Sequence, residues 1–260
     1  MYTLPETEHV QISERPESDR VSVFTIEPLS PGYGMTLGHS FRRVLLTSLE
    51  GASVSYVKIE GVDHEFTTLK GMREDVVDLI LNLKAMRVRS ESADPVTIHL
   101  SKKGSGTVSA RDFEPSADVT IADPDHYLAT LEKDGKLVMD VIIEKGRGYL
   151  PVERKPRDER AIGTIAIDSV FTPIKRVHYE VEHTRVGGQT DFDRLTLELT
   201  TDGTVTPAEA MAHASKILVE HFGLVGQAAE TYVAEQAATP ETKPKKKAAA
   251  KKSKKETKSE

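Results

Sequence analysis

Residues 31–46 are PGYGMTLGHSFRRVLL, a glycine turn leading into an amphipathic pattern, and this stretch decides how the fold is interpreted. Before it, Val21–Ile26 is rich in β-branched and aromatic residues and predicts a strand. After it, the apolar spacing predicts a helix from Thr36 to Leu49, which Gly51 ends. The apolar residues of this helix are Leu37, Phe41, Val44, Leu45 and Leu49.

The same helix carries a large apolar residue away from its main apolar stripe. At about 100° per residue, Leu46 falls on the far side of the helix, among His39, Arg42 and Arg43. Two interpretations remain open at this point. Either another part of the chain covers Leu46, or leucine and arginine together form a contact surface for a partner protein.

The glycine turn also raises the possibility of a nucleotide-dependent enzyme, because glycines between a strand and a helix can bind phosphate. However, Leu37 stands where the third glycine of a dinucleotide fingerprint belongs, and Gly38 comes one residue late. No Gly-Lys-Ser/Thr of a P-loop follows. We therefore favour a structural tight turn and expect no bound cofactor.

The middle of the chain predicts a β-rich region with one helix. Met72–Met86 has helical apolar spacing, whereas the other segments are short and alternating, with glycine turns between them. The predicted strands are Val54–Ile59, Val96–Leu100, Val119–Ile121 and Leu137–Ile143.

The last third predicts a hairpin and a long helix. Alternation around Val177–Val181 and Leu195–Leu199 indicates two half-buried strands, joined by a longish loop that starts at Gly187. A capping box, Thr206-Pro207-Ala208-Glu209, begins the helix. Its apolar residues recur every three or four positions and include Met211, Leu218, Phe222 and Val225.

These patterns together predict an α+β fold in which a β-rich domain is inserted into another domain. We expect a dimerisation domain from residues 1–50 and 174–236, an inserted domain at 51–173 and a disordered tail at 237–260. The two helices carry more apolar surface than one hairpin can cover, which predicts a homodimer. The expected interface comprises Leu37, Phe41, Val44, Leu45, Met211, Leu218, Phe222 and Val225.

Charge is distributed unevenly along the 260 residues. The segment Thr239–Glu260 has 9 Lys and 3 Glu, hence +6, and since the whole chain is −6, the first 238 residues carry −12. An acidic body argues against a broad nucleic-acid surface, so any direct DNA contact is expected to be weak and nonspecific, through the tail. The chain has no cysteine, no long apolar run and no export signal at Met1–Arg20, which indicates a cytoplasmic protein without a membrane partner.

No active site or metal site is evident in the residue pattern. The paired acids Asp123/Asp125 and Asp191/Asp193 lack a supporting third acid, and turn formation explains both pairs. The histidines lack metal-binding spacing, and no serine stands in a Gly-x-Ser-x-Gly elbow. We expect no catalytic residue in this chain.

The sequence resembles the bacterial RNA polymerase alpha subunit family over about residues 20–232. The resemblance rests first on residues 31–46. Further similar motifs follow in the same order, namely residues 61–66, 71–76, 81–84, 146–152, 162–173 and 185–204. Several long motifs in order are far more specific than any single short one.

The resemblance implies a non-catalytic assembly subunit of the DNA-directed RNA polymerase, a nucleotidyltransferase whose chemistry belongs to the larger beta and beta-prime subunits. It implies a homodimer on which those subunits assemble, with omega and sigma in the complete enzyme, acting on DNA indirectly in the nucleoid. Arg43 and Leu46 match positions that contact beta. Positions associated with beta-prime contact are matched by Lys84, Thr172, Pro173 and Ile174.

The sequence departs from the family pattern at two places. His39 stands where the family usually has asparagine, which affects the capping or contact made there. Family members usually continue into a small helical domain that binds promoter DNA, whereas this chain has the lysine-rich tail. We therefore do not expect that domain's function here.

Overall fold

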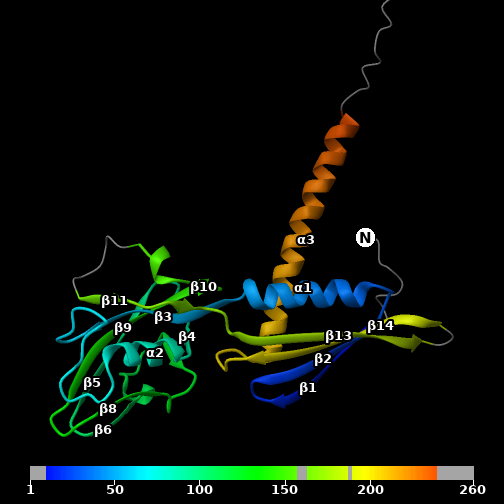
Figure 1. Ribbon diagram of the computed structural model, residues 1–260. Coiled ribbons are helices and arrows are strands. Elements are labelled where there is room, and N and C mark those ends of the chain that lie inside the picture. Colours follow the sequence, from blue (N-terminus) through cyan, green and yellow to red (C-terminus); the bar gives the residue numbers. More distant parts are fainter. Residues whose placement is uncertain (1–9, 157–162, 187–188, 239–260) are drawn as a thin grey trace, which may run out of the picture. The chain divides into compact units, whose positions relative to one another are not determined.

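The structure is a computed structural model that describes residues 10–156, 163–186 and 189–238 (Figure 1). It is α+β, as predicted, with three α-helices and two larger antiparallel sheets among these residues. The described chain divides after Val219 into two units, so the end of the last helix is described by itself. The tail predicted to be disordered lies largely outside the described residues.

A four-stranded antiparallel sheet combines segments from the two ends of the sequence. Its strand order is β1-β2-β14-β13, and β2 pairs with β14 through partners such as Phe24 and Leu197. Strands β2, β13 and β14 alternate buried and more exposed positions over much of their length, which confirms the half-buried strands expected from the sequence. They are β1 (Gln11–Ser18), β2 (Val21–Leu29), β13 (Ile174–Val186) and β14 (Gln189–Thr201).

Two features of this sheet differ from the sequence prediction. Strand β1 was not predicted, because all eight of its residues are exposed and it has no apolar alternation to reveal it. The predicted long loop is wrong as well, since β13 reaches Val186 and β14 begins at Gln189, which pair with each other. The polar residues after Gly188 therefore belong to a strand rather than to a loop.

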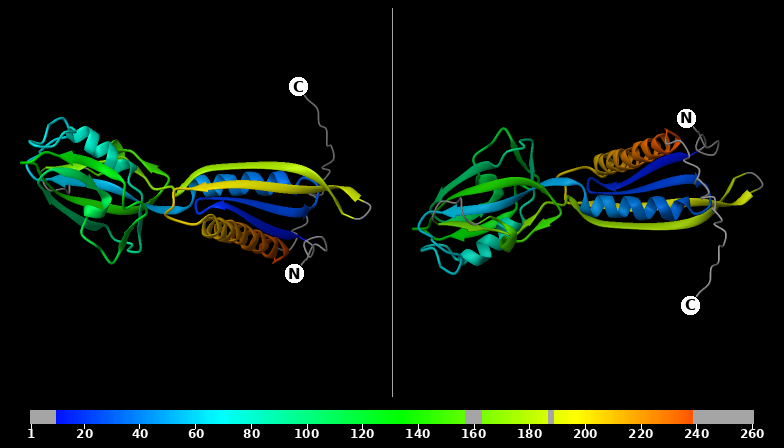
Figure 2. Two further views of the ribbon diagram at one scale, coloured as in Figure 1. Left: turned by 90° about the horizontal axis from the view of Figure 1, so that it is seen from below. Right: turned by 90° about the horizontal axis from the view of Figure 1, so that it is seen from above.

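Helix α1 (Tyr33–Thr47) lies along one face of this sheet (Figures 1 and 2). Its fully buried residues are Gly34, Gly38 and Leu45. A Cβ on Gly38 would stand 2.5 Å from a ring carbon of Tyr179, so the missing side chain lets the helix approach β13 closely. The buried side of α1 therefore differs from the predicted apolar stripe. The prediction considered only apolar side chains, whereas Gly34 and Gly38 pack against the sheet because they have none.

The middle of the chain forms the larger hydrophobic core around a six-stranded antiparallel sheet. The strand order is β5-β9-β3-β4-β7, and β11 also pairs with β3. Its strands are β3 (Glu50–Ile59), β4 (Val88–Ser90), β5 (Val96–Lys103), β7 (Val119–Ile121), β9 (Lys136–Arg147) and β11 (Thr164–Ala166). Smaller pairs are β6 (Gly106–Ser109) with β8 (Tyr127–Leu131), and β10 (Tyr149–Leu150) with β12 (Ser169–Val170).

Helix α2 (Val76–Ala85) packs onto this core through Val76, Leu79 and Leu83. It begins later than predicted, because the Asp75 carboxylate accepts a hydrogen bond from the Asp78 N–H at 2.7 Å and caps the helix there. Met72, predicted to be helical, instead makes a β-bridge with Leu131.

Helix α3 (Pro207–Ala238) begins with the predicted capping box. The Glu209 N–H donates to the Thr206 hydroxyl at 3.2 Å, and the Glu209 carboxylate accepts from the Thr206 N–H at 2.9 Å. Ala210 and Ala214 then enter the same buried cluster as Leu45 of α1. The beginning of α3 is thus fixed to the four-stranded sheet.

Candidate assembly surfaces

The start of α1 is anchored by an acidic residue of β14. The Asp193 Oδ2 atom accepts hydrogen bonds from the N–H groups of Gly32 at 2.8 Å and Gly34 at 3.1 Å. Gly32 has a φ of 83°, a left-handed conformation that favours glycine. A carboxylate also suits this end of a helix, where the backbone dipoles present positive charge.

This arrangement accounts for the glycine turn without a nucleotide. The N–H groups that a phosphate would need are already bound to Asp193, which is 3% exposed. The prediction that Asp191 and Asp193 form a turn is wrong, because both lie in β14. Asp123 and Asp125 do lie in a turn, as predicted.

The predicted beta-contact residues lie near the end of α1. Arg43 is exposed and is directed away from the sheet, since it stands about half a turn from the buried positions Gly38 and Leu45. Leu46 is only half-buried and packs against the core cluster that contains Leu45. The chain therefore covers one side of Leu46, as the first interpretation expects, and leaves the rest accessible. Contact with a partner protein stays a prediction.

The predicted dimer residues of α1 fall into two groups. Leu37, Phe41 and Val44 are half-buried against the protein's own sheet clusters and keep some accessible surface. Leu45 has an exposed fraction of 0%, because it faces the sheet, so its inclusion in a surface between copies was wrong. It supports the helix from within.

On α3 the predicted residues become more exposed along the helix. Met211 and Leu218 are half-buried, whereas Phe222 and Val225 are 65% and 67% exposed. The predicted interface left out four further exposed apolar residues of α3. Three of them do not follow the spacing of three and four residues, and Tyr232 follows it but was not included. They are Val219, Leu224, Tyr232 and Val233.

Lys84, the predicted beta-prime contact, belongs to a polar cluster beside α2. Its ammonium lies 2.8 Å from the Asp168 carboxylate and 5.9 Å from the centre of the Tyr149 ring. The other Asp168 oxygen accepts from the Val152 N–H at 3.0 Å. The Lys84 hydrogen bond and the Val152 N–H hold the pKa of Asp168 below its ordinary value, and the bond to Asp168 raises the pKa of Tyr149.

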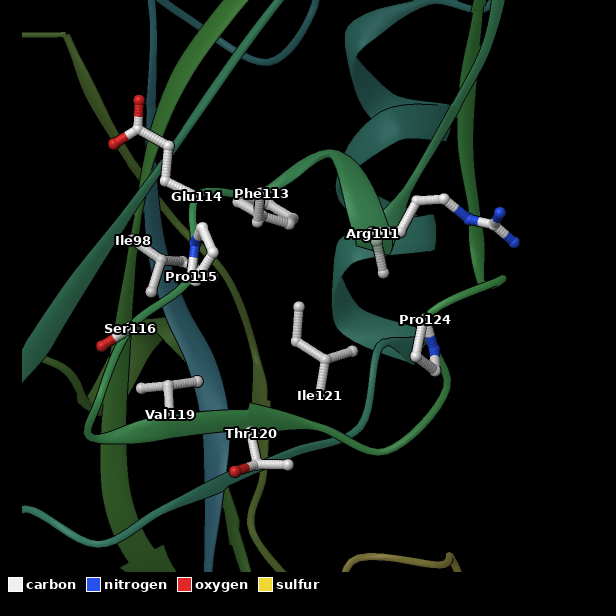
Figure 3. A pocket seen from close by; sticks show the side chains of 11 residues that line it. Ile98, Arg111, Phe113, Glu114, Pro115, Ser116, Val119, Thr120, Ile121 and Pro124 are labelled. Atoms are coloured by element: carbon white, nitrogen blue, oxygen red, sulfur yellow. The ribbon is translucent and has the colours of Figure 1, made fainter.

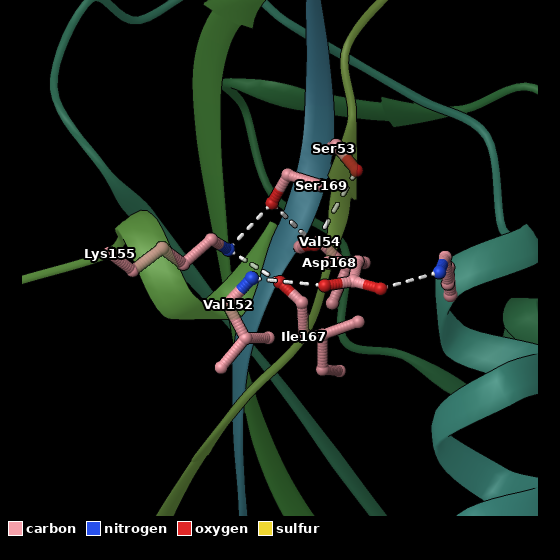
Figure 4. A network of polar contacts seen from close by, with 8 residues as sticks. Ser53, Val54, Val152, Lys155, Ile167, Asp168 and Ser169 are labelled. Atoms are coloured by element: carbon pink, nitrogen blue, oxygen red, sulfur yellow. Dashed lines mark hydrogen bonds and ion pairs between the residues drawn. The ribbon is translucent and has the colours of Figure 1, made fainter. Parts of the chain in front are cut away.

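A buried lysine fixes the backbone on either side of Asp168 (Figure 4). Lys155 is 3% exposed, and its ammonium donates to the Ile167 carbonyl at 2.5 Å and the Ser169 hydroxyl at 2.7 Å. It also donates to the Ser55 carbonyl on β3 at 3.0 Å. Sequence analysis missed Lys155, since a single lysine in a polar stretch is normally a surface residue.

A groove of about 370 Å³ runs beside this cluster. Lys84 and Asp168 line it together with the apolar side chains Phe66, Ile80 and Leu81. Phe66 is 81% exposed and Leu81 is 55% exposed, so the groove joins apolar surface to an ion pair. Aromatic and apolar anchors beside a charge are typical of protein–protein contacts.

The other predicted beta-prime residues differ in accessibility. Thr172 is half-buried, whereas Pro173 and Ile174 are buried and serve the fold. The Pro173 carbonyl accepts from the Asp202 N–H at 2.9 Å, and Ile174 belongs to the core beneath α1. Direct contact through Pro173 or Ile174 side chains is therefore a prediction that the structure corrects, while the neighbouring Lys175 and Arg176 are exposed.

The described residues contain no group of three or more histidines or acids placed to hold a metal ion. None of the helices in the described ranges has both the length and the apolar character needed to cross a bilayer.

Similarity in the middle of the chain indicates the class of protein. Residues 57–172 match the model of the RNA polymerase Rpb3/RpoA insert domain. Over longer stretches the chain is similar to proteins named DNA-directed RNA polymerase subunit alpha. It is 50% identical over 208 residues to that of Symbiobacterium thermophilum, covering 80% of this chain and 66% of the relative. It is 51% identical over 203 residues to that of Herpetosiphon aurantiacus, covering 78% and 61%.

A third relative, from Desulfitobacterium hafniense, is 47% identical over 215 residues, covering 83% of this chain and 68% of the relative. The chain therefore belongs to the family of bacterial DNA-directed RNA polymerase alpha subunits. It spans between 61% and 68% of the length of these three relatives.

Proposed function

We propose that this chain is a non-catalytic assembly subunit of DNA-directed RNA polymerase. Two copies form a dimer, and the dimer is the platform on which beta and beta-prime assemble, with omega and sigma joining the complete enzyme. The nucleotidyl transfer belongs to the larger subunits. Family membership supports this proposal. The exposed apolar surface supports assembly with partners. The glycine turn offers no free N–H groups of Gly32 and Gly34 for a nucleotide phosphate, because Asp193 already accepts hydrogen bonds from both.

The platform has two domains in this proposal. Residues 1–50 and 174–236 form the dimerisation domain, and residues 51–173 form the inserted domain. The pairing of β2 with β14 supports the first, because it unites the two outer segments in one sheet. The insert-domain match at residues 57–172 falls within the proposed inserted region.

The main observation in support of a dimer is the exposed apolar surface of α3. Phe222, Val225 and Tyr232 are each about two-thirds exposed. Soluble proteins rarely expose so many large apolar side chains on one element without a partner. A second copy, packing helix against helix, would remove this surface from water. Phe41 and Val44 of α1, which are half-buried, are a separate part of the proposed interface.

The larger subunits use two different surfaces. Beta contacts Arg43 and the accessible part of Leu46 on α1, where a cation lies beside an apolar side chain. Beta-prime contacts Lys84 and Thr172, and the groove with Phe66 and Leu81 supplies apolar anchors. The two surfaces lie on different elements, so one chain can present either or both.

The complete assembly acts on DNA in the cytoplasm, within the nucleoid. The lysine-rich tail adds transient, sequence-independent attraction to upstream DNA, because its +6 charge can neutralise phosphates and its sequence has no large apolar residue to anchor it. Deleting residues 239–260 should then flatten the salt dependence of upstream binding and leave discrimination between sequences unchanged. Identical salt slopes with and without the tail would contradict this contact.

Co-expression with beta and beta-prime tests the proposal as a whole. The expected product is a complex with two copies of this chain for one copy of each larger subunit, measured by native mass spectrometry. The isolated chain should have the mass of a dimer in sedimentation experiments at low micromolar concentration. Recovery of monomer together with tight nucleotide binding would instead favour an enzyme that uses the Gly32 turn.

A further inference from the structure

The six-stranded sheet ends at β7, whose outer edge borders a pocket (Figure 3). At the other end of the sheet, the chain after Phe113 continues along β5, since the Glu114 N–H donates to the His99 carbonyl at 2.8 Å. The pocket is lined both by Val119–Ile121 of β7 and by Phe113–Ser116. It therefore marks a seam where the two ends of the sheet approach each other but do not pair.

The register of β4 and β7 shows which backbone groups face the seam. The Ala122 N–H donates to the Arg87 carbonyl at 3.0 Å, and the Glu91 N–H donates to the Asp118 carbonyl at 2.9 Å. Because hydrogen-bonded pairs alternate along an antiparallel ladder, the backbone groups of Val119 and Ile121 point the other way. Their N–H and C=O groups form an open ladder on the pocket side, within the described part of the chain.

The pocket at the seam is small, and most of its lining residues are apolar, although Arg111, Glu114, Ser116 and Thr120 also line it. Ile98, Phe113, Val119 and Ile121 line it, and in Figure 3 Ile121 points into the space between the two ends of the sheet. The pocket volume is about 280 Å³. This is at or below the lower end of ligand pockets, roughly 300 Å³, and suits short aliphatic side chains better than a cofactor.

The rim of the seam is acidic. Arg111 pairs with Asp125, and Glu114, Asp118 and Asp123 are exposed without an ion pair to any described residue. A partner with lysine or arginine beside its apolar residues would complement this rim. The chain's own tail has the charge but no large apolar side chain, so it does not match the pocket.

We infer that the seam is a docking site for an extended peptide segment of a partner protein, which adds a strand to β7. The segment alternates aliphatic side chains that enter the pocket with residues that face solvent, and it carries basic residues at its ends. Every named pairing in this sheet is antiparallel, so the added strand runs antiparallel to β7. Main-chain hydrogen bonds would provide affinity, and the apolar pocket would provide selectivity.

The test uses the full chain and a synthetic peptide, acetyl-Lys-Val-Thr-Val-Thr-Val-Lys-amide, with a fluorescent label. In antiparallel pairing, the valines that enter the pocket also direct their N–H groups toward β7. An analogue methylated on the valine nitrogens should bind about tenfold more weakly or worse, because it loses more than one ladder hydrogen bond. An analogue methylated on the threonine nitrogens should retain its affinity. Binding is measured by fluorescence anisotropy.

Hydrogen exchange locates the peptide on the protein. The amides of Val119 and Ile121 should exchange more slowly when the parent peptide is bound, and those of β1 should not change. No binding of the parent peptide at millimolar concentration, or equal loss with both analogues, would overturn the proposal.

Substitutions in the protein test the pocket separately from the ladder. Ser116→Trp places a ring at the pocket wall and should abolish binding, whereas Ser101→Trp, on the exposed face of β5, should leave it intact. Val119→Pro removes an N–H group that faces the seam and keeps the hydrogen bonds to β4, so it should weaken binding. A melting curve that matches that of the wild type shows that this variant is folded. Unchanged binding by both Ser116→Trp and Val119→Pro would also overturn the proposal.

Discussion

Asp193 and Gly34 are 159 positions apart in the sequence, yet the carboxylate of one accepts a hydrogen bond from the N–H of the other at 3.1 Å. The same carboxylate oxygen accepts from the Gly32 N–H. This contact fixes the entry into α1, the helix that carries Arg43 and Leu46. The position of α1 thus depends on a buried anion of β14.

Replacing Asp193 should destabilise the protein markedly. Asp193→Ala leaves the buried Gly34 N–H without its acceptor, which should cost about 2–3 kcal/mol of unfolding free energy. Asp191→Ala is the matched control, because Asp191 is exposed on the same strand and should change stability by less than about 0.5 kcal/mol. Urea unfolding at one fixed protein concentration measures both. Equal effects would mean that the anchor does not hold α1.

Gly38→Ala should destabilise the protein although alanine is the better helix former. A Cβ at this position would lie 2.5 Å from Tyr179 and 3.0 Å from Leu195, so the helix would have to move away from the sheet. We expect a net loss of about 1–3 kcal/mol in thermal or urea unfolding. Gly223→Ala on α3 meets no atom within 4 Å and should be neutral or stabilising. A stabilised Gly38→Ala would refute the close packing of α1.

Charge on the exposed face of α3 should separate the dimer. Phe222→Glu and Val225→Glu place carboxylates among apolar side chains that are proposed to meet a second copy, so desolvation opposes association. Analytical ultracentrifugation at low micromolar concentration should show monomers. Gln227→Glu adds the same charge at an exposed polar position of the same helix and tests for a simple charge effect. Persistent dimers of both apolar variants would place the interface elsewhere.

Arg43→Ala should weaken beta capture without altering the dimer. Arg43 is exposed and makes no ion pair with any described residue, so its loss leaves the fold intact. Loss of an anchor in a protein interface commonly costs more than about 2 kcal/mol, or roughly thirtyfold in affinity. Lys58→Ala, which removes an exposed cation of β3, is the control in pull-down titrations.

At Leu46, alanine is a better test than a charged residue. Leu46→Ala should weaken beta capture with only modest loss of stability, whereas aspartate there would also disturb the core cluster that Leu46 touches. Unaltered beta capture by both Arg43→Ala and Leu46→Ala would show that another face of the dimer binds beta.

Asp168→Asn should release Lys84 and weaken beta-prime capture. The pKa of Asp168 is lowered in the folded protein, so the pair stabilises the fold above the unfolded carboxyl pKa, near 4, and the effect is lost as pH falls through the lower folded value. The stability difference between wild type and Asp168→Asn should therefore be constant above about pH 5 and shrink in more acidic solution. Unfolding at several pH values measures it.

Glu153→Gln provides the comparison for Asp168→Asn. Glu153 also lines the groove beside Lys84, but it is exposed and pairs with no described cation. Its substitution should leave both beta-prime capture and the pH profile close to wild type. A flat difference across pH for Asp168→Asn would argue against an ion pair with Lys84.

The sequence by itself determined the elements whose signals are local. The capping box at Thr206 predicted where α3 begins, and alternation at Val177–Val181 predicted β13, because each depends on residues only a few positions apart. The motifs of residues 31–46 likewise indicate the family from the sequence alone. Local spacing determines such features because helices and strands have fixed periods.

Only the tertiary structure decided which face of each element is used. Leu45 and Ile174 look like the other apolar residues in the sequence, but distant segments cover them completely or almost so. Lys155 looks like a surface residue, but its ammonium is buried and donates hydrogen bonds to the carbonyls of Ser55 on β3 and of Ile167 after β11. The same holds for Asp193, which accepts hydrogen bonds from the N–H groups of Gly32 and Gly34, far away in the sequence. Burial and hydrogen bonding depend on residues brought together by the fold, and no local pattern records them.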